Sequence, residues 1–399
     1  MTTAAETEFP AIEPPKLGEP YLLTPGPLTT AYSVKEKMLR DWGSRDYDFR
    51  DMTAEIRRRL VAMAGDSSGE YDCVPMQGSG TFSVEAMCGS LLPRDSRTLV
   101  LVNGAYGKRI AKILDYLNRD HVVIDKGDYL PPRGSEVTAA LKADPSITHV
   151  IVVHCETSSG ILNPLKEISG AVAAAGCKLL IDSMSAFGAL PLNVNEIQFA
   201  GMVSSANKCI EGVPGFGFVI AKKSELEAAK GVSHSLSLDL YDQWTSMNKT
   251  QQWRFTPPTH VLAAFTEALR LHELEGGVAG RGARYARNRD VLVEGMRELG
   301  FETLLQDEWL APIILTFFNP IHPNFDFEAF YKGMAERNFV IYPGKLTVVD
   351  SFRIGCIGWM DETMIRQAIA AAKEVLDELG VDDASPSPAA LSEREKLAA

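Results

Sequence analysis

Short apolar runs alternate with amphipathic stretches over more than a hundred residues in the middle of this chain. The apolar runs are rich in Val, Ile and Leu and lie at 98–102, 121–124, 148–154, 178–182, 200–205 and 216–221. Stretches with helical spacing precede or separate them at 80–92, 105–118, 135–143 and 164–175. Strands that alternate with helices in this way predict an α/β fold, with a mostly parallel sheet covered by helices on both faces.

The character of the sequence changes after about residue 258. Long amphipathic helices at 258–275 and 280–299 lead into shorter strand-like segments and further helices near 326–338 and 361–379. This pattern predicts a second, smaller α+β domain. The expected parts are an N-terminal arm at 1–20, a large domain at 21–275, a small C-terminal domain at 276–381 and a tail at 382–399. The tail is expected to be disordered, because it has few apolar residues to bury.

Charge and cysteine usage exclude several functions. The net charge is −12, from 40 Lys and Arg against 52 Asp and Glu, and no basic cluster interleaves with aromatic residues, so nucleic-acid binding has no electrostatic basis. The six cysteines show no C-x-x-C spacing, which argues against a zinc site or a disulfide framework, and no metal is expected. Without a signal-peptide pattern or an apolar run of membrane-spanning length, we expect a soluble, cytoplasmic protein with no membrane partner.

Lys208 has the most distinctive surroundings of any charged residue in the chain. It lies within SSANKCIEGVPGFGFVI (204–220), among small and apolar residues and before a series of glycines. A partly desolvated lysine amine can attack a carbonyl, although a lone lysine is more often a solvated surface residue. Asp182 ends the apolar run KLLID, at the sheet edge where open α/β proteins bind ligands. The two residues together indicate a site.

The sequence QGSGT (77–81) precedes a helical pattern and offers an anion cradle. Ser79, Gly80 and Thr81 would place backbone N–H groups and hydroxyls at a helix N-terminus. No convincing strand precedes these residues, and Ser83 stands where a dinucleotide fingerprint has its third glycine. An ordinary N-capped helix after a turn stays open as the alternative.

Three further residues can contact a flat, acidic ligand. Tyr106 in NGAYGKR can stack on a ring, Thr157 in HCETSSGILNP can reach a ring substituent, and Arg353 in SFRIGCIG can bind a carboxylate or phosphonate. A packing tyrosine, an ordinary turn and a structural ion pair are the respective alternatives. Combined with Lys208 and Asp182, the set meets the requirements of pyridoxal phosphate, a cofactor that acts as an electron sink.

These motifs, with LLTPGPLTT, SLSLDLYDQW, WRFTPPTH and VIYPGK, resemble the class V aminotransferases of the type I pyridoxal-phosphate fold, in particular the branch that acts on 2-aminoethylphosphonate. The resemblance covers about residues 20–380. It implies an aspartate-aminotransferase-like large domain with a seven-stranded sheet. It also implies a ping-pong reaction in which 2-aminoethylphosphonate and pyruvate give phosphonoacetaldehyde and L-alanine.

The resemblance further implies a role for each site residue. Lys208 would hold the cofactor as an aldimine and then move the proton, while Asp182 would keep the ring nitrogen protonated. The remaining residues implied to contact cofactor or substrate are Tyr106 on the ring, Thr157 near the ring hydroxyl, Ser79, Gly80, Thr81 and Asn207 at the phosphate, and Arg353 at the substrate's acid group. Thr256 would reach the phosphate of a neighbouring subunit, which implies a homodimer with shared sites.

Other functions remain open at this stage. An alanine:glyoxylate or serine:pyruvate transaminase would use nearly the same residues, because an arginine binds carboxylate and phosphonate alike. A desulfurase needs a reactive cysteine, and Cys356 in the apolar run RIGCIG lacks that character. An NAD-dependent dehydrogenase would explain the alternating sheet but not Lys208 with Asp182. A non-catalytic binding module is the third alternative.

Overall fold

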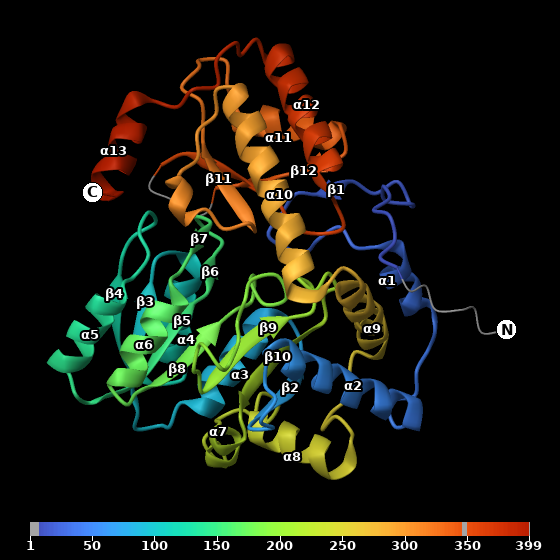
Figure 1. The fold of residues 1–399 in the computed structure, drawn as a ribbon, viewed down its shortest axis with the longest axis vertical. Coiled ribbons are helices and arrows are strands. Elements are labelled where there is room, and N and C mark those ends of the chain that lie inside the picture. Colours follow the sequence, from blue (N-terminus) through green and yellow to red (C-terminus); the bar gives the residue numbers. More distant parts are fainter. Residues whose placement is uncertain (1–7, 345–348, 399) are drawn as a thin grey trace.

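A seven-stranded sheet forms the centre of the larger lobe of this computed structural model, which describes residues 8–344 and 349–398 (Figure 1). The order of the strands is β2-β10-β9-β8-β5-β3-β4. Their bounds are β2 (Tyr71–Gln77), β3 (Arg97–Val102), β4 (Asp120–Asp125), β5 (Ile147–Val153), β8 (Lys178–Asp182), β9 (Gly201–Ser205) and β10 (Phe216–Lys222). All neighbouring strands pair in parallel except β10, which is antiparallel to both β9 and β2. The predicted mostly parallel sheet is confirmed.

The expectation that no strand precedes the glycine turn at 78–80 was wrong. β2 pairs with β10 along its whole length and ends directly before that turn. Pro75 stands in the middle of β2 and obscures the strand pattern in the sequence. An edge strand tolerates a proline, because the missing N–H can face away from the neighbouring strand.

Helices cover both faces of the large sheet, and alternate strand residues enter two separate cores. Leu99 and Leu101 of β3 lie in the first core, whereas Val100 and Val102 lie in the second. The helices that contribute to the first core are α2 (Tyr47–Met63), α5 (Gly134–Ala143), α6 (Leu165–Ala174) and α9 (Thr259–Leu274). Those of the second are α3 (Gly80–Leu91), α4 (Ala105–Tyr116), α7 (Lys223–Ala228) and α8 (Leu240–Thr250). Because both faces of the sheet are covered, the residues of a strand such as β3 are apolar on both sides, which is why the strands appear in the sequence as continuous apolar runs.

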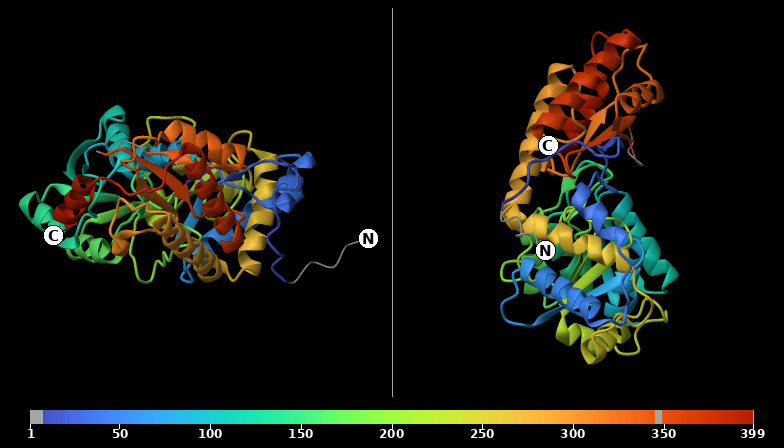
Figure 2. Two further views of the ribbon diagram at one scale, coloured as in Figure 1. Left: turned by 90° about the horizontal axis from the view of Figure 1, so that it is seen from above. Right: turned by 90° about the vertical axis from the view of Figure 1, so that its right-hand side faces the viewer.

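The smaller lobe is built on a three-stranded antiparallel sheet in the order β11-β14-β13 (Figure 2). Its elements are β11 (Ile314–Phe318), α11 (Phe327–Glu336), β13 (Tyr342–Pro343), β14 (Ser351–Gly355) and α12 (Glu362–Leu379). The long helix α10 (Gly277–Glu298) runs from the larger lobe into this one (Figure 1). Phe301, Phe317, Phe330 and Phe352 form an aromatic centre, with the rings of Phe301 and Phe352 5.4 Å apart.

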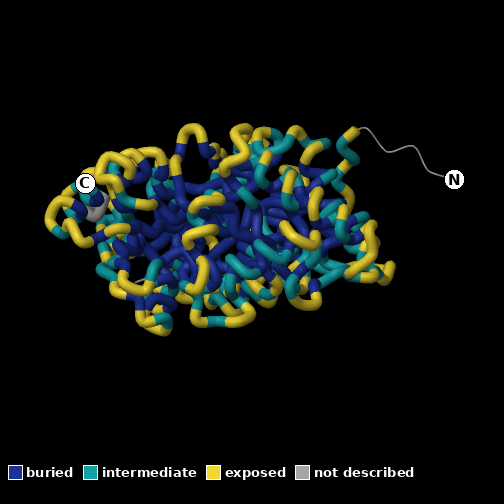
Figure 3. Tube along the Cα trace, turned by 90° about the horizontal axis from the view of Figure 1, so that it is seen from below, coloured by how far each residue is buried: buried dark blue, intermediate teal, exposed yellow. Residues whose placement is uncertain are grey.

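The start of the predicted large domain is attached to the smaller lobe. β1 (Tyr21–Leu22) pairs in parallel with β12 (Phe339–Val340), and Tyr21 and Leu23 lie in the core of that lobe. The remaining short elements are α1 (Tyr32–Glu36), η1 (Lys37–Leu39), β6 (Cys155–Glu156), β7 (Ile161–Leu162) and η2 (Asp307–Trp309). Exposed residues lie mostly at the periphery of the molecule and buried ones in its interior (Figure 3). The domain limits proposed above stay predictions.

The expected disorder of the tail at 382–399 differs from the structure, in which α13 (Pro388–Ala398) forms a helix. Ala390 and Leu391 pack against a small core that contains Tyr129, Leu304 and Phe318. A few apolar residues are enough here, because the helix packs on an existing surface and does not need a core of its own. Among the described residues, no helix combines the length and apolar character needed to cross a membrane.

Candidate active site

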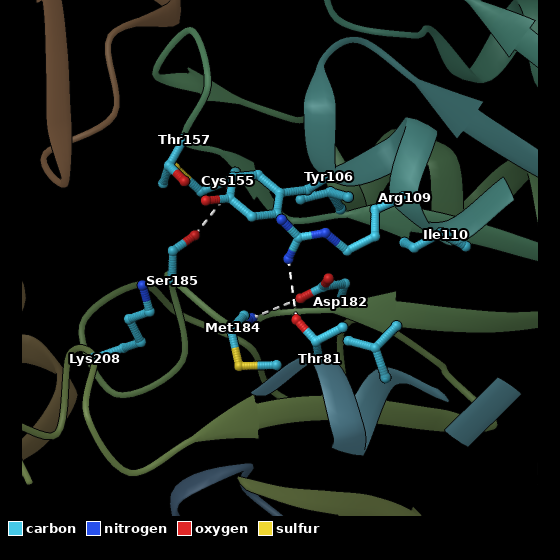
Figure 4. A pocket seen from close by; sticks show the side chains of 12 residues that line it. Thr81, Tyr106, Arg109, Ile110, Cys155, Thr157, Asp182, Met184, Ser185 and Lys208 are labelled. Carbon is cyan, nitrogen blue, oxygen red and sulfur yellow. Dashed lines mark hydrogen bonds between the residues drawn. The ribbon is translucent and has the colours of Figure 1, made fainter. Parts of the chain in front are cut away.

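Five of the predicted site residues line one cavity at the carboxyl ends of the parallel strands (Figure 4). They are Thr81 on α3, Tyr106 on α4, Thr157 after β6, Asp182 at the end of β8 and Lys208 in the loop after β9. The space between these side chains has a volume of about 450 Å³, which includes open solvent at the mouth of the cavity. Residues far apart in the sequence therefore meet at the sheet edge that the topology predicts.

The Lys208 side chain lies against the loop that contains Gly26. Its Nζ donates a hydrogen bond to the carbonyl oxygen of Pro25 at 2.5 Å. A Cβ atom on Gly26 would lie 2.6 Å from this Nζ, and the φ of Gly26 is +118°, so both the contact and the backbone require glycine. The motif LLTPGPLTT thus packs directly on the lysine, which its sequence alone did not indicate.

Asp182 is a buried carboxyl group at the floor of the cavity. Burial raises its pKa to about 6, and the negative charge of Glu156 acts in the same direction. The N–H of Met184 donates to its Oδ1 at 3.0 Å and opposes this rise, as do the charges of Arg109 and Lys208. A buried carboxylate is stabilised when a ligand brings a proton donor or a positive charge to it.

We expect Asp182→Asn to stabilise the cofactor-free protein at neutral pH. The folded-state pKa of about 6 lies above the ordinary value of 3.8, so the folded protein binds more protons between these values and the wild type loses stability as the pH rises through them. A difference of about two pKa units corresponds to about 3 kcal/mol. Urea unfolding of both apoproteins should give stabilities that diverge from about pH 4 to just above about pH 6, and that then stay apart. Parallel curves for the two proteins would contradict this expectation.

The other end of the cavity has the features of an anion site. Arg109 Nη1 donates to Thr81 Oγ1 at 3.0 Å, at the start of α3, and the guanidinium lies 4.8 Å from the centre of the Tyr106 ring. Ser79 is the N-cap of α3, and its side chain forms no capping hydrogen bond. A Cβ on Gly80 would collide with Met184 Sδ. A helix N-terminus beside a fixed positive charge suits a phosphate group.

Arg353 reaches the cavity residues from the smaller lobe. It lies on β14 and is 4% exposed. Its Nη1 donates to the carbonyl oxygen of Thr157 at 2.9 Å and its Nε to that of Pro343 at 3.0 Å. Burial lowers the pKa of Arg353, while Tyr106, Tyr342 and Glu156 oppose this change. The arginine thus lies where both lobes meet, although it does not line the cavity itself.

The remaining predicted residues do not line this cavity. Ser79 and Gly80 lie next to Thr81 at the start of α3, and Asn207 is half-buried beside Lys208. Thr256 is exposed, in the segment between α8 and α9. Lys345, the last residue of VIYPGK, lies outside the described residues. The roles assigned to all of these residues stay predictions.

The sequence analysis missed several residues of the cavity. Arg109 follows Tyr106 by three positions on α4, and this helical spacing was a signal that could have identified it. Cys155, Met184 and Ser185 also line the cavity, and Ser185 Oγ donates to the Cys155 carbonyl oxygen at 2.8 Å (Figure 4). Each is two or three positions from a predicted residue, but only the tertiary structure directs it inward.

Solved structures of several aminotransferases share this architecture. The TM-score is 0.80 against an aspartate aminotransferase of subgroup IV from Thermus thermophilus, at 23% identity over 90% of this chain and 99% of that one. It is 0.83 against the pyridoxamine-pyruvate aminotransferase from Mesorhizobium loti, at 21% identity over 96% and 98% of the two chains. At these identities the likeness shows the fold, and it confirms the aspartate-aminotransferase-like architecture.

Sequence comparisons define the family. The model of the family "Aminotransferase class-V" matches residues 121–345. The chain is 73% identical over 383 residues to the 2-aminoethylphosphonate–pyruvate transaminase of Rhizobium meliloti (strain 1021), covering 96% of this chain and all of that one. It is 67% identical to transaminase 1 of the same name from Paraburkholderia xenovorans (strain LB400), over 96% and 99% of the chains. The protein is therefore a class V aminotransferase. Within that class it belongs to the family of the 2-aminoethylphosphonate–pyruvate transaminases, which confirms the resemblance.

Proposed function

We propose that this enzyme transfers the amino group of 2-aminoethylphosphonate to pyruvate, with pyridoxal phosphate as its cofactor. The observation that carries the proposal is the meeting of Lys208, Asp182, Tyr106 and Thr81 in one cavity. The products would be phosphonoacetaldehyde and L-alanine. The names and high identity of the relatives support this choice of substrates.

The donor set of the cavity fits this cofactor. Lys208 offers an amine for the aldehyde, and the buried carboxyl of Asp182 suits a protonated ring nitrogen. Tyr106 offers a flat ring, and Thr81 with Arg109 offers an anion site for the phosphate at the start of α3. When bound, pyridoxal phosphate supplies the aldehyde that takes up the amino group and a ring that accepts electron density.

The residues of the chain would divide the remaining work. Lys208 would hold the cofactor and then act as the base that carries a proton at Nζ, close to the Pro25 carbonyl that orients it. Asp182 would hold a proton on the ring nitrogen, because an ionised carboxylate in this buried position favours a positive neighbour. Tyr106 would cover the ring and exclude water. Arg353 would bind the phosphonate of one substrate and the carboxylate of the other.

We further propose a homodimer in the cytoplasm. Thr256 and the neighbouring Phe255 are exposed, and Phe255 remains 48% accessible in the single chain. A second copy that covers this segment would bring Thr256 to the phosphate end of its neighbour's cavity, as the resemblance implies. The described cysteines are all unpaired, and a reducing compartment would keep them so.

An amine panel tests the substrate proposal. With the cofactor-loaded enzyme and pyruvate, we expect 2-aminoethylphosphonate to give a kcat/KM at least about 100-fold above that of ethylamine, because ethylamine leaves the arginine fork without its acid partner. β-Alanine is the matched control, since it keeps the spacing and replaces the phosphonate by a carboxylate. L-Alanine formation is the measurement. Faster turnover of serine, or of alanine with glyoxylate, would instead support the other transaminase activities.

A further inference from the structure

Glu156 is a fully buried carboxylate next to the cavity that the proposed mechanism does not use. It ends β6, immediately before Thr157, and its exposed fraction is 0%. Its neighbours Cys155 and Thr157 line the cavity, whereas Glu156 does not. A group in this position cannot contact a bound ligand directly, but it can decide how the residues around it are placed.

Four hydrogen bonds converge on this carboxylate. Oε2 accepts the backbone N–H groups of Tyr106 and Gly107, at 3.0 and 3.1 Å. Oε1 accepts the N–H of Ser158 at 3.1 Å and its hydroxyl at 2.6 Å. Burial raises the pKa of Glu156, and these hydrogen bonds oppose the rise. All four partners are donors, so the ionised carboxylate, which only accepts, satisfies each of them.

The chain leaves room for this side chain at one glycine. A Cβ on Gly104 would lie 2.5 Å from Glu156 Cγ and would collide with Ser158 Oγ. Gly104 is also the N-cap of α4, and as a glycine it has no side chain that could cap the helix. Glu156 therefore caps α4 from a distant part of the sequence, where the positive end of the helix favours a negative charge.

The same carboxylate connects three parts of the site. It holds the N–H of Tyr106, and one turn further along α4 lies Arg109, which contacts Thr81. It also fixes the turn that contains Thr157, because it accepts hydrogen bonds from the backbone N–H and from the hydroxyl of Ser158. The carbonyl oxygen of Thr157 in turn accepts the hydrogen bond from Arg353 of the smaller lobe.

We propose that Glu156 is a positioning residue that holds Tyr106 and Thr157, and through Thr157 also Arg353, in place around the cavity that contains Lys208 and Asp182. The proposal rests on the proposed function, since it assigns these residues to cofactor and substrate. Substitution of a residue that only stabilises the fold would lower the melting temperature and leave ligand binding unchanged. Substitution of a positioning residue would also change the affinity for the cofactor and the KM for the amine.

Glu156→Gln is the main test, because glutamine keeps the shape but turns an NH₂ group towards two of the donors. We expect cofactor affinity, from titration of the apoenzyme, to fall by roughly 10- to 100-fold, as for loss of hydrogen bonds to a charged group. The visible circular dichroism of the bound cofactor should weaken, because Tyr106 no longer fixes the ring. The KM for 2-aminoethylphosphonate should rise, because Arg353 loses its support at Thr157.

Glu267→Gln is the matched control. Glu267 is a buried carboxylate on α9 that pairs with Arg270 and does not line the cavity. The Glu267→Gln variant should have a lower melting temperature, with the cofactor affinity and the visible dichroism of the wild type. The proposal is overturned if Glu156→Gln behaves in the same way, with cofactor affinity, dichroism and KM within about two-fold of the wild type.

Two further measurements keep the test decisive. If Glu156→Gln does not give folded protein, Ser158→Ala keeps the carboxylate and removes the hydroxyl, which donates to Glu156 and accepts the N–H of Ala105 at the start of α4. A several-fold loss of cofactor affinity supports the proposal, and unchanged affinity contradicts it. If the wild type itself forms no alanine from 2-aminoethylphosphonate, the proposed substrate is wrong. The cofactor titrations would still decide the role of Glu156 in that case.

Discussion

Replacement of Lys208 by alanine is expected to lower kcat for alanine formation by about 10⁴-fold, because the proposed mechanism assigns to Lys208 both the amine that holds the cofactor and the base that moves the proton. The side chain packs on Gly26 and Pro25 and is half-buried, so its loss should change stability far less than activity. Steady-state assays of the purified variant with 2-aminoethylphosphonate and pyruvate would measure the effect.

Lys230→Ala is the control for this substitution, since Lys230 is an exposed lysine close to the end of α7. It should leave kcat unchanged. Borohydride reduction of the loaded wild type, followed by peptide mass analysis, should find the mass of the cofactor on the peptide that contains Lys208 and on no other. Substantial activity in Lys208→Ala, or a label on another lysine, would show that a different residue holds the cofactor.

The sequence predicted the parts of the fold that depend on local patterns. The buried strands of the large sheet appeared as apolar runs, and Lys208 and Asp182 stood out because each breaks such a pattern at its end. β2 was missed because Pro75 interrupts a strand whose pairing with β10 is visible only in the sheet. Helix α13 was missed because the partly buried Leu391 packs against residues far away in the sequence.

In the candidate site, too, the sequence predicted the residues that follow a local pattern and missed those that depend on tertiary contacts. Tyr106 and Thr157 could be proposed because they follow predicted strands at the expected edge. The role of Gly26 depends on a contact with Lys208, a residue far away in the sequence. Glu156 stands within the motif HCETSSGILNP without any local sign that it receives donors from α4. Such tertiary contacts have no periodicity, so propensity and spacing alone do not reveal them.

A buried network of charges joins the Lys208 loop to the smaller lobe. Glu211 Oε1 accepts hydrogen bonds from Arg284 Nη2 at 2.8 Å and from the Tyr285 hydroxyl at 2.5 Å. Arg284 also donates to the carbonyl oxygens of Gly358 and Met360, which follow the strand of Arg353. Glu275 accepts from Arg284 and Arg281, so two carboxylates balance two guanidinium groups. The Glu211 N–H donates to the Lys208 carbonyl oxygen at 2.7 Å, which ties the Lys208 loop to this network.

Glu211→Gln is expected to lower the free energy of unfolding by about 3–5 kcal/mol, because it leaves two buried guanidinium groups with one carboxylate. Glu211 also has a φ of +62°, an unusual value for a residue other than glycine, which the hydrogen bonds of its side chain help to maintain. Urea unfolding at a fixed protein and cofactor concentration would measure the loss. We also expect a lower kcat, since the backbone of Lys208 is held by the same residue.

Two comparisons separate the buried network from ordinary surface pairing. Glu336 and Lys332 form an exposed pair one turn apart on α11, and Glu336→Gln should change stability by less than about 1 kcal/mol. The double variant Glu211→Gln/Arg284→Met removes a charge of each sign and should recover part of the stability lost in Glu211→Gln, because less charge remains buried without a partner. Two results would contradict this coupling of the Lys208 loop to the smaller lobe. One is a loss of stability in Glu211→Gln as small as that in Glu336→Gln, and the other is a double variant whose loss equals the sum of the two single losses.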